Sequence, residues 1–449
     1  MSLYTLLRAR AEAGEPLCVG LIGAGKFGTM FLAQARRTPG LQIMGIADLS
    51  LERAREACRR AGWADEAFAA PDFDTARAGG TTHLTEDVQA LIATGGLDVV
   101  VEATGDPAAG IAHALAAFGH GCHVVMVTVE GDVLAGPLLA RRAEAAGLVY
   151  SLAYGDQPAL ICEMVDWARA CGFAVVCAGK GTKYLPAYHA STPETVWGYY
   201  GLTADEAEAG GMNPQMFNSF LDGTKSAIEM AAVANACGLG PQAAGLGFPP
   251  CAAHDLANVL KPSADGGALG RKGTVEVVSS LERDGREIAD DLRWGVYVTF
   301  EAADDYVKRC FAEYGLATDE SGRYAAMWTP YHLIGLELGI SVASVGLLGE
   351  PIGCARGFAA DVAAVAKRDL GAGEVLDGEG GYTVWGKLTP AADSLKLGAL
   401  PLGLAHGVKL TSAVAEGEIL RWADVDIDAA DPTVAFRREM EAAFAIAEG

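Results

Sequence analysis

Short apolar runs and longer amphipathic segments alternate along the first third of the chain. The runs predict strands, and the segments between them predict helices of about a dozen residues. The predicted strands span residues 19–22, 41–47, 97–103, 122–127 and 148–152. The predicted helices span residues 29–37, 49–61, 108–118 and 134–146, and residues 71–87 are predicted to be irregular. Because strands that are apolar on both faces belong inside a parallel sheet, this part predicts a doubly wound α/β domain.

The middle and the end of the chain follow different patterns. Residues 156–353 mix helical and alternating segments, which favours an α+β substrate and dimerisation domain. Its predicted helices span residues 158–170, 216–237 and 331–348, and its predicted strands span residues 173–178, 274–281 and 294–300. Later, short elements at 362–376 and 408–420 predict a small β-rich module, which a helix at 432–447 closes. We therefore expect three domains, at residues 1–155, 156–353 and 354–449.

A glycine-rich segment follows the first predicted strand and opens the first predicted helix. From Gly23 to Gly28 it reads Gly-Ala-Gly-Lys-Phe-Gly, which matches the G-x-G-x-x-G pattern of dinucleotide-binding turns. Gly23 allows a tight turn, Gly25 lets the backbone approach a pyrophosphate, and Gly28 allows close packing of helix on strand. The next strand ends at Asp48, roughly 20 residues later, where a carboxylate can accept hydrogen bonds from a ribose. The pattern predicts a Rossmann nucleotide site.

These residues leave the choice between NAD and NADP open. Asp48 favours NAD because its carboxylate repels a 2′-phosphate, whereas Ser50, Arg53 and Arg55 can hold that phosphate. Ligands of such sheets bind beyond the carboxyl ends of the strands, so the turn after residue 103 is expected to belong to the cofactor site as well. The residues expected to contact the cofactor are Gly23, Gly25, Lys26, Phe27, Gly28, Asp48, Arg53, Thr104 and Gly105.

Composition and charge narrow the class of protein. A chain of 449 residues, 51% hydrophobic and 20% charged, indicates a compact globular protein. Its net charge of -23 argues against nucleic-acid and membrane partners, because both are anionic. The ten cysteines form no C-x-x-C pair, which favours reduced buried thiols. Residues 1–15 lack the apolar core of a signal peptide, so we expect a cytoplasmic protein.

Two lysines, Lys180 and Lys183, lie in a glycine-flanked segment at 179–184 that is predicted to turn after a buried strand. In so acidic a protein they would create a local positive site for phosphate recognition or proton transfer, although a solvated turn would read the same way. The segment is not a phosphate-binding P-loop, because glycine follows Lys180.

The predicted helix at 216–237 carries four polar side chains on one face. Asn218, Asp222, Lys225 and Glu229 are spaced four, three and four residues apart. They are either part of a site or simple helical ion pairs, which contribute little each. Two further acids, Glu130 and Asp156, follow predicted strands and could hold a metal, bind sugar hydroxyls or merely cap helices. The metal ligands themselves stay unknown.

Several of these motifs together resemble a known family. The glycine turn and Val101-Glu102-Ala103-Thr104-Gly105 are similar to homoserine dehydrogenase and its relatives. The segments Lys-Arg-Asp-Leu-Gly-Ala-Gly-Glu-Val-Leu and Val-Ala-Glu-Gly-Glu-Ile-Leu resemble a SAF domain, a small β module. With residues 151–158 and 178–186 between them, the whole resembles the 1-deoxy-D-xylulose 5-phosphate reductoisomerase-like oxidoreductases. Glu130 stands where homoserine enzymes carry an asparagine–lysine pair, which counts against homoserine as substrate.

The resemblance implies an NADPH-dependent isomeroreductase of isoprenoid precursor synthesis. Such an enzyme rearranges 1-deoxy-D-xylulose 5-phosphate to a branched aldehyde, which hydride reduces to 2-C-methyl-D-erythritol 4-phosphate. The chemistry requires a cationic phosphate pocket, acid–base groups and an electrophile, which in this family is Mg²⁺ or Mn²⁺ held by carboxylates. The implied catalytic set is Lys180, Lys183, Lys225, Asp222, Glu229, Glu130 and Asp156. A phosphorylated sugar substrate and a homodimer or other homo-oligomer are implied as well.

Two other functions fit the same residues. One is an NAD(P)-dependent dehydrogenase of another hydroxy-aldehyde or sugar-derived acid, without rearrangement. The other is a non-catalytic redox sensor that binds NADPH and signals through the SAF module. A sensor would have its lysines in solvent, so Lys183→Ala would leave its ligand responses intact, whereas in either enzyme this substitution would lower turnover.

Overall fold

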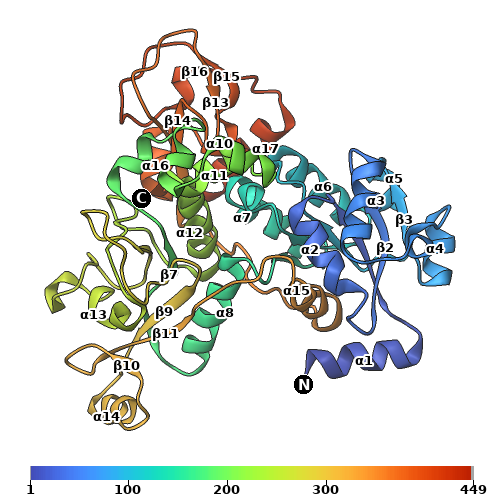
Figure 1. Ribbon diagram of the computed structural model, residues 1–449, viewed down its shortest axis with the longest axis horizontal. Helices are drawn as coiled ribbons and strands as arrows, with labels where there is room; N and C mark the ends of the chain where they lie inside the picture. Colours follow the sequence, from blue (N-terminus) through green and yellow to red (C-terminus); the bar gives the residue numbers. More distant parts are fainter. Residues whose placement is uncertain (1, 446–449) are drawn as a thin grey trace. The chain divides into compact units, whose positions relative to one another are not determined.

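The computed structural model describes residues 2–445, and these fall into two compact units, each with its own internal contacts (Figure 1). Unit 1 is drawn from Met1–Leu160 and His332–Arg356, and unit 2 from Ile161–Tyr331 and Gly357–Gly449. The chain thus leaves unit 1, builds most of unit 2, and returns to unit 1 for a short segment. The division into three domains at 1–155, 156–353 and 354–449 stays a prediction.

Unit 1 is built on a six-stranded parallel sheet with the strand order β3-β2-β1-β4-β5-β6. Its strands are β1 (Leu17–Ile22), β2 (Leu41–Ala47), β3 (His83–Thr85), β4 (Val99–Glu102), β5 (His123–Met126) and β6 (Tyr150–Leu152). This order is that of a Rossmann fold, with the order reversing between β1 and β4. The α/β class predicted from the apolar runs is therefore confirmed, and Ile22 pairs with both Ala47 and Glu102 at the carboxyl ends.

The helices of unit 1 accompany this sheet. They are α1 (Leu3–Ala13), α2 (Lys26–Ala35), α3 (Leu51–Arg60), η1 (Asp65–Phe68), α4 (Phe73–Gly79), α5 (Val88–Ala93), α6 (Pro107–Gly119), α7 (Val129–Ala145), α15 (Gly339–Ala343) and the π-helical turn η5 (Ser344–Leu348). The prediction of irregular structure at 71–87 was wrong, because Asp72 caps α4 by accepting the N–H of Thr75 at 2.7 Å, and β3 follows. The helix predicted at 331–348 begins late, because Gly335 has a φ of 71°.

Unit 2 is built on a mixed five-stranded sheet with the order β10-β11-β9-β7-β8. Its strands are β7 (Ala174–Thr182), β8 (Thr274–Ser279), β9 (Val296–Glu301), β10 (Ala317–Thr318) and β11 (Tyr324–Thr329). β7, β9 and β11 lie side by side with α8 (Gln157–Ala170) next to them (Figure 1). The ring of Trp167 on α8 packs edge-on against Phe300 of β9, with 5.6 Å between centroids. An apolar helix face thus covers the sheet, as the α+β pattern predicts.

The remaining elements of unit 2 are short. Before residue 331 they are η2 (Pro186–Ala190), α9 (Val196–Tyr200), α10 (Ala204–Ala209), α11 (Pro214–Leu221), α12 (Thr224–Cys237), η3 (Ala253–Asp255), α13 (Leu256–Val259), η4 (Ser263–Asp265) and α14 (Asp305–Glu313). After residue 357 they are β12 (Ala360–Ala366), β13 (Val375–Asp377), β14 (Val384–Pro390), α16 (Ala391–Leu397), η6 (Leu402–Leu404), β15 (His406–Leu410), η7 (Trp422–Asp424), β16 (Val425–Asp426) and α17 (Pro432–Phe444). The β-rich C-terminal module is confirmed, as β12–β14 and β13–β15–β16 form two small sheets. Residues 446–447 of the predicted last helix lie outside the described residues.

Two further features bear on earlier predictions. All ten cysteines are free, and the sulfurs of Cys162 and Cys237 lie 3.4 Å apart. Among residues 2–445, every helix is too short or too polar to cross a bilayer.

Candidate functional site

The glycine turn between β1 and α2 has the geometry that a dinucleotide requires. Gly23 has a φ of 96°, and a Cβ there would lie 2.5 Å from the carbonyl oxygen of Ala103. A Cβ on Gly28 would lie 2.4 Å from the oxygen of Gly23, so this glycine allows helix and strand to approach. At Gly25, by contrast, a Cβ would meet no atom within 4 Å. The backbone at Gly25 is therefore open, which fits the approach of a pyrophosphate.

Asp48 and Arg53, predicted as opposing determinants of cofactor choice, bind each other. One oxygen of Asp48 accepts the N–H of Ala24 at 2.8 Å and so ties the glycine turn to the end of β2. The other oxygen accepts the N–H of Ser50 at 2.9 Å and Nε of Arg53 at 2.8 Å. Asp48 is buried, whereas half of the Arg53 side chain is exposed. The negative charge at this position is thus balanced, and the guanidinium borders the place where a ribose is expected.

The predicted turn at Thr104 and Gly105 is held by a residue that the sequence reasoning missed. The buried Glu102, at the end of β4, accepts the hydroxyl of Thr104 at 2.6 Å and the hydroxyl of Thr128 with its other oxygen. Thr128 in turn accepts the N–H of Gly105 at 3.0 Å, where φ is 75°. The position of Glu102, inside a predicted strand that is otherwise mostly apolar, was the sequence signal that could have identified it.

The other predicted residues of unit 1 lie at helix starts. Lys26 is exposed at the first position of α2, and Phe27 packs partly against the apolar core. Glu130 lies in the first turn of α7 and not at the end of a strand as expected, because β5 stops at Met126. Asp156 precedes α8, and its carboxylate accepts the N–H of Gln157 at 3.0 Å. Both acids are half-buried, and the contact of Asp156 fits the capping alternative.

In unit 2, Lys180 and Glu229 form a buried ion pair. The segment 179–182 was expected to turn, but it continues β7, because Gly179 and Lys180 pair with Tyr297 and Val296 of β9. The ammonium of Lys180 donates to a carboxylate oxygen of Glu229 on α12, and the side chains are 7% and 3% exposed. Charges excluded from water in this way interact strongly with any reacting group that reaches them.

The helix predicted at 216–237 is broken in the middle. α11 ends at Leu221, Gly223 has a φ of 89°, and α12 begins at Thr224, so the four polar residues do not share one face. Asp222 lies at the break, fully buried, and accepts the N–H of Thr224 at 2.9 Å. Lys225 lies half-buried in the first turn of α12. The apolar periodicity ran through the break, and Gly223 was its one signal.

Lys367, which the sequence reasoning did not single out, is the counter-ion of Asp222. It follows β12 directly, its ammonium lies 2.8 Å from the Asp222 carboxylate, and it also donates to the carbonyls of Ser191 at 2.8 Å and Gly381 at 2.7 Å. Burial raises the pKa of Asp222, and the charge of Lys367 opposes that effect. The C-terminal module thus contributes a side chain to this cluster. A lysine directly after a fully buried strand was the available signal.

His189 connects the same turn to the C-terminal module. Its Nδ1 lies 2.7 Å from the carbonyl oxygen of Asp222, so that nitrogen carries the proton, and Nε2 accepts the hydroxyl of Tyr184 at 2.9 Å. The imidazole stacks on Trp385 with 3.9 Å between centroids, and burial lowers its pKa. These contacts indicate a structural role for His189. Lys183 donates to the carbonyl of Tyr199 at 2.6 Å, and burial lowers the pKa of its ammonium.

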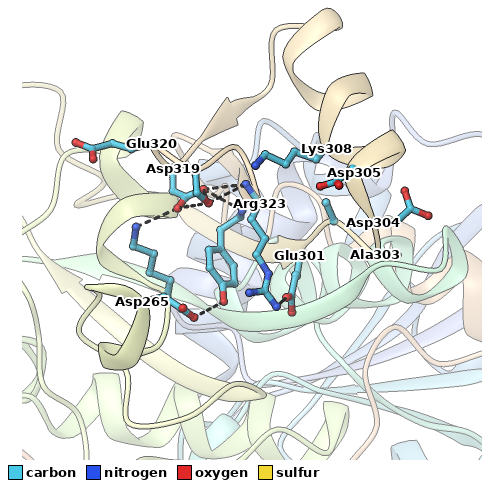
Figure 2. Close-up of a pocket in the computed structure, with 13 residues that line it drawn as sticks. Asp265, Glu301, Ala303, Asp304, Asp305, Lys308, Asp319, Glu320 and Arg323 are labelled. Atoms are coloured by element: carbon cyan, nitrogen blue, oxygen red, sulfur yellow. Dashed lines mark hydrogen bonds and ion pairs between the residues drawn. The ribbon is translucent and has the colours of Figure 1, made fainter.

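A pocket of about 730 Å³ in unit 2 has a different composition (Figure 2). Two ion pairs lie in its lining, Lys261 with Asp319 at 3.0 Å and Arg323 with Glu301, and Figure 2 labels further acids there, among them Asp304, Asp305 and Glu320. The hydroxyl of Tyr324 donates to Asp265 at 2.6 Å. None of the residues predicted for catalysis is among those that line this pocket. The ion pairs in its lining link the segments around the pocket to one another.

Metal ligands do not gather within the part of the chain that the structure describes. Among residues 2–445 no group of three or more His, Cys, Asp or Glu side chains is placed to hold a metal ion. A Mg²⁺ or Mn²⁺ site therefore stays a prediction.

Two family models match parts of this chain. Residues 17–127 match the oxidoreductase family with an NAD-binding Rossmann fold, and residues 155–338 match the catalytic domain of oxidoreductase DRL. The first match contains the glycine turn. The second match contains Lys180, Lys183, Asp222, Lys225 and Glu229, whereas Lys367 lies beyond it. No curated protein matches this chain.

Solved structures resemble this chain at low identity. A probable dehydrogenase from Thermotoga maritima is 13% identical over 75% of this chain and 90% of that chain, with a TM-score of 0.38. The 1-deoxy-D-xylulose 5-phosphate reductoisomerase from Zymomonas mobilis, in complex with NADPH, is 20% identical over 48% and 56%, with a TM-score of 0.33. An oxidoreductase from Agrobacterium radiobacter, in complex with NAD+, L-tartaric acid and magnesium, is 18% identical over 37% of this chain, with a TM-score of 0.29. The match spans 44% of the Agrobacterium radiobacter chain, less than half of its length.

Proposed function

We propose that this chain is an oxidoreductase that uses NADPH to reduce a phosphorylated hydroxy-carbonyl compound, and that the reaction is the conversion of 1-deoxy-D-xylulose 5-phosphate to 2-C-methyl-D-erythritol 4-phosphate. The observation that carries the proposal is the buried Lys180–Glu229 pair within the DRL-type catalytic domain. Reduction of a carbonyl places negative charge on its oxygen, and a positioned ammonium both stabilises that charge and donates a proton. Lys180 takes this role, and Glu229 orients it.

The cofactor supplies hydride, and residues of unit 1 fit its binding. The open backbone at Gly25 receives the pyrophosphate, and the N–H groups that begin α2 point toward it. Arg53, half exposed and already held by Asp48, binds the 2′-phosphate that distinguishes NADPH from NADH. Balancing the Asp48 charge with Arg53 removes the repulsion that would otherwise favour NADH.

The rearrangement needs a second group that moves a hydroxyl proton. Asp222 suits this task, because its carboxylate is buried, its pKa is raised by burial, and Lys367 holds it in place. Lys225, in the turn that follows Asp222, would contact the substrate hydroxyls. A divalent cation and a homo-oligomer remain parts of the proposal that need their own measurement.

A simple dehydrogenase of a hydroxy-aldehyde or a sugar-derived acid is the second candidate. The Lys180–Glu229 pair favours it as well, because one buried proton donor is sufficient for hydride transfer without rearrangement. A dehydrogenase of this kind would be indifferent to a phosphorylated ketose and to chelators.

The test is NADPH consumption with 1-deoxy-D-xylulose 5-phosphate, with and without Mn²⁺ and again with NADH, followed by NMR of the product. A branched product supports the isomeroreductase, whereas chelator-insensitive reduction of an unphosphorylated hydroxy-aldehyde, with no turnover of this ketose, supports the dehydrogenase. Lys180→Met should abolish turnover, whereas Lys272→Met, which removes a half-exposed lysine paired with Glu301 on the same sheet, should not. No turnover of this substrate under every condition, with NADPH still bound, overturns the assigned reaction.

A further inference from the structure

Two cationic side chains of unit 2 converge on one tyrosine ring. The ammonium of Lys183 lies 5.7 Å from the ring centroid of Tyr200, and the guanidinium carbon of Arg293 lies 5.9 Å from the same centroid. Arg293 also lies 4.8 Å from the ring centroid of Trp294. The ring of Tyr200 is itself fixed, because Phe217 packs edge-on against it at 5.7 Å. The two cations are therefore neighbours on a rigid aromatic support.

The backbone brings these residues together. β7 runs antiparallel to β9, and beyond the last pair the N–H of Gly181 donates to the carbonyl of Gly295 at 3.1 Å. A Cβ on Gly181 would lie 2.0 Å from the oxygen of Leu292, so glycine is required where the strand passes the turn before β9. Lys183 follows two residues later, next to the turn that carries Arg293.

Neither side-chain cation forms an ion pair with a carboxylate among the residues that the structure describes. Lys183 contacts the carbonyl of Tyr199 and the ring of Tyr200, and the guanidinium of Arg293 contacts two aromatic rings. The carboxylate of Asp291 accepts the backbone N–H of Arg293 at 2.6 Å, and the charge of the exposed Glu287 raises the pKa of Lys183 against the larger opposing effects of burial and Arg293. In a chain with a net charge of -23, two half-buried cations on one ring without an ion-pair partner indicate a place for an anion.

We propose that Lys183 and Arg293 bind the phosphate monoester of the substrate. The assignment rests on the proposed function, and it states which residues hold the phosphate group of the substrate. Two positive charges match a phosphate dianion, and arginine offers a planar fork while lysine offers a point charge. Burial raises the pKa of Tyr200 to about 12, so its hydroxyl stays protonated at neutral pH and can donate to a phosphate oxygen.

The test measures phosphate binding without turnover. Inorganic phosphate is titrated calorimetrically into the full-length chain, into Lys183→Met and into Arg293→Met. Loss of one charged hydrogen bond should weaken binding about tenfold in each variant. Arg309→Met is the matched control, because Arg309 also lies over a tyrosine, 5.7 Å from the ring centroid of Tyr306, in an exposed position. Glu287→Gln, which removes a repulsive charge, should tighten binding.

Conservative variants and an activity measurement make the outcome decisive. Lys183→Arg and Arg293→Lys keep the positive charge and should retain most of the phosphate binding. They serve as the comparison if either methionine variant is unstable. Failure of the wild-type chain to bind phosphate, wild-type affinity for phosphate in both methionine variants, or tighter binding of acetate than of phosphate overturns the assignment. Phosphate binding that depends on these two residues, without any turnover of 1-deoxy-D-xylulose 5-phosphate, overturns only the proposed reaction. Turnover with an unchanged KM in Arg293→Met overturns only the phosphate site.

Discussion

The ammonium of Lys367 lies 2.8 Å from the carboxylate of Asp222, and both side chains are buried, at 2% and 0% exposure. The two residues come from the C-terminal module and from the turn between α11 and α12. Other hydrogen bonds join the same two segments: Asn218 donates to the carbonyl of Gly380 at 2.8 Å, and the N–H of Gly386 donates to the hydroxyl of Thr224 at 2.8 Å. The C-terminal module is therefore an integral part of unit 2 and not a separable lid.

Replacing Lys367 should strongly destabilise unit 2. Lys367→Met leaves the Asp222 carboxylate buried without a counter-ion, which costs about 3 to 5 kcal/mol of unfolding free energy. Urea denaturation followed by circular dichroism measures the loss. The double variant Lys367→Met with Asp222→Asn should recover much of it, and Arg286→Met, which breaks an exposed pair with Asp284, should change little. Equal effects of Lys367→Met and Arg286→Met would contradict this account.

The Lys180–Glu229 pair predicts a separation of chemistry from cofactor binding. Lys180→Met should lower kcat about a hundredfold or more, the usual contribution of a general acid, while the affinity for NADPH stays the same. Glu229→Gln keeps the shape of the side chain but orients the ammonium less well, so it should lower kcat less and change its pH profile. Steady-state kinetics and fluorescence titration of NADPH make the measurement. An equal loss of NADPH affinity would assign the pair a structural role.

The open backbone at Gly25 predicts a variant that folds and does not bind the cofactor. Gly25→Val places a Cβ atom where no other described protein atom lies within 4 Å, so the melting temperature should hardly change. The same side chain occupies the path of the pyrophosphate, and NADPH binding should weaken more than tenfold. Gly28→Ala is the contrasting variant, because its Cβ would lie 2.4 Å from the oxygen of Gly23 and should lower stability instead.

Arg53 should decide the preference for NADPH. Arg53→Met removes the group expected to bind the 2′-phosphate and frees the charge of Asp48 that now faces it. KM for NADPH should rise about tenfold, the cost of one charged hydrogen bond, while KM for NADH stays the same or falls. Arg59→Met, which removes an arginine of the same helix that is paired with Asp65, serves as the control. A parallel change for both cofactors would rule out this role.

The buried Asp132 predicts a pH dependence of stability in unit 1. One oxygen accepts the hydroxyl of Tyr150 at 2.9 Å, the other has no hydrogen-bond partner, and burial raises the pKa of the carboxyl to about 7. Between about pH 4 and pH 7 the folded protein holds a proton that the unfolded chain has released, so stability falls as pH rises through this window. The total loss is about 4 kcal/mol. Asp132→Asn should remove it, and parallel pH profiles of the two proteins in denaturation would disprove the assignment.

The parts of the fold that depend on local pattern were predictable from the sequence. β2 has the predicted bounds, and the order of strands and helices in unit 1 follows the alternation of apolar runs. The site was predictable only in part, because no local rule of the sequence places Lys180 next to Glu229. Lys180 lies in a strand that looks like a turn, since glycines on either side of it pack against neighbouring backbone. Lys367 and Arg293 owe their positions to contacts between distant segments, which periodicity does not encode.

The return of the chain to unit 1 has a consequence for the order of synthesis. Leu338, Val342 and Val345 belong to the same apolar core as Leu17 and Phe31. The N–H of Leu152 on β6 donates to the carbonyl of Gly353 at 2.9 Å, so the edge of the Rossmann sheet is completed by a residue made much later. On the ribosome, the first 160 residues emerge with part of this core uncovered, and they stay so until the segment up to Arg356 follows. The incomplete apolar core of unit 1 therefore stays accessible to chaperones while most of unit 2 is translated.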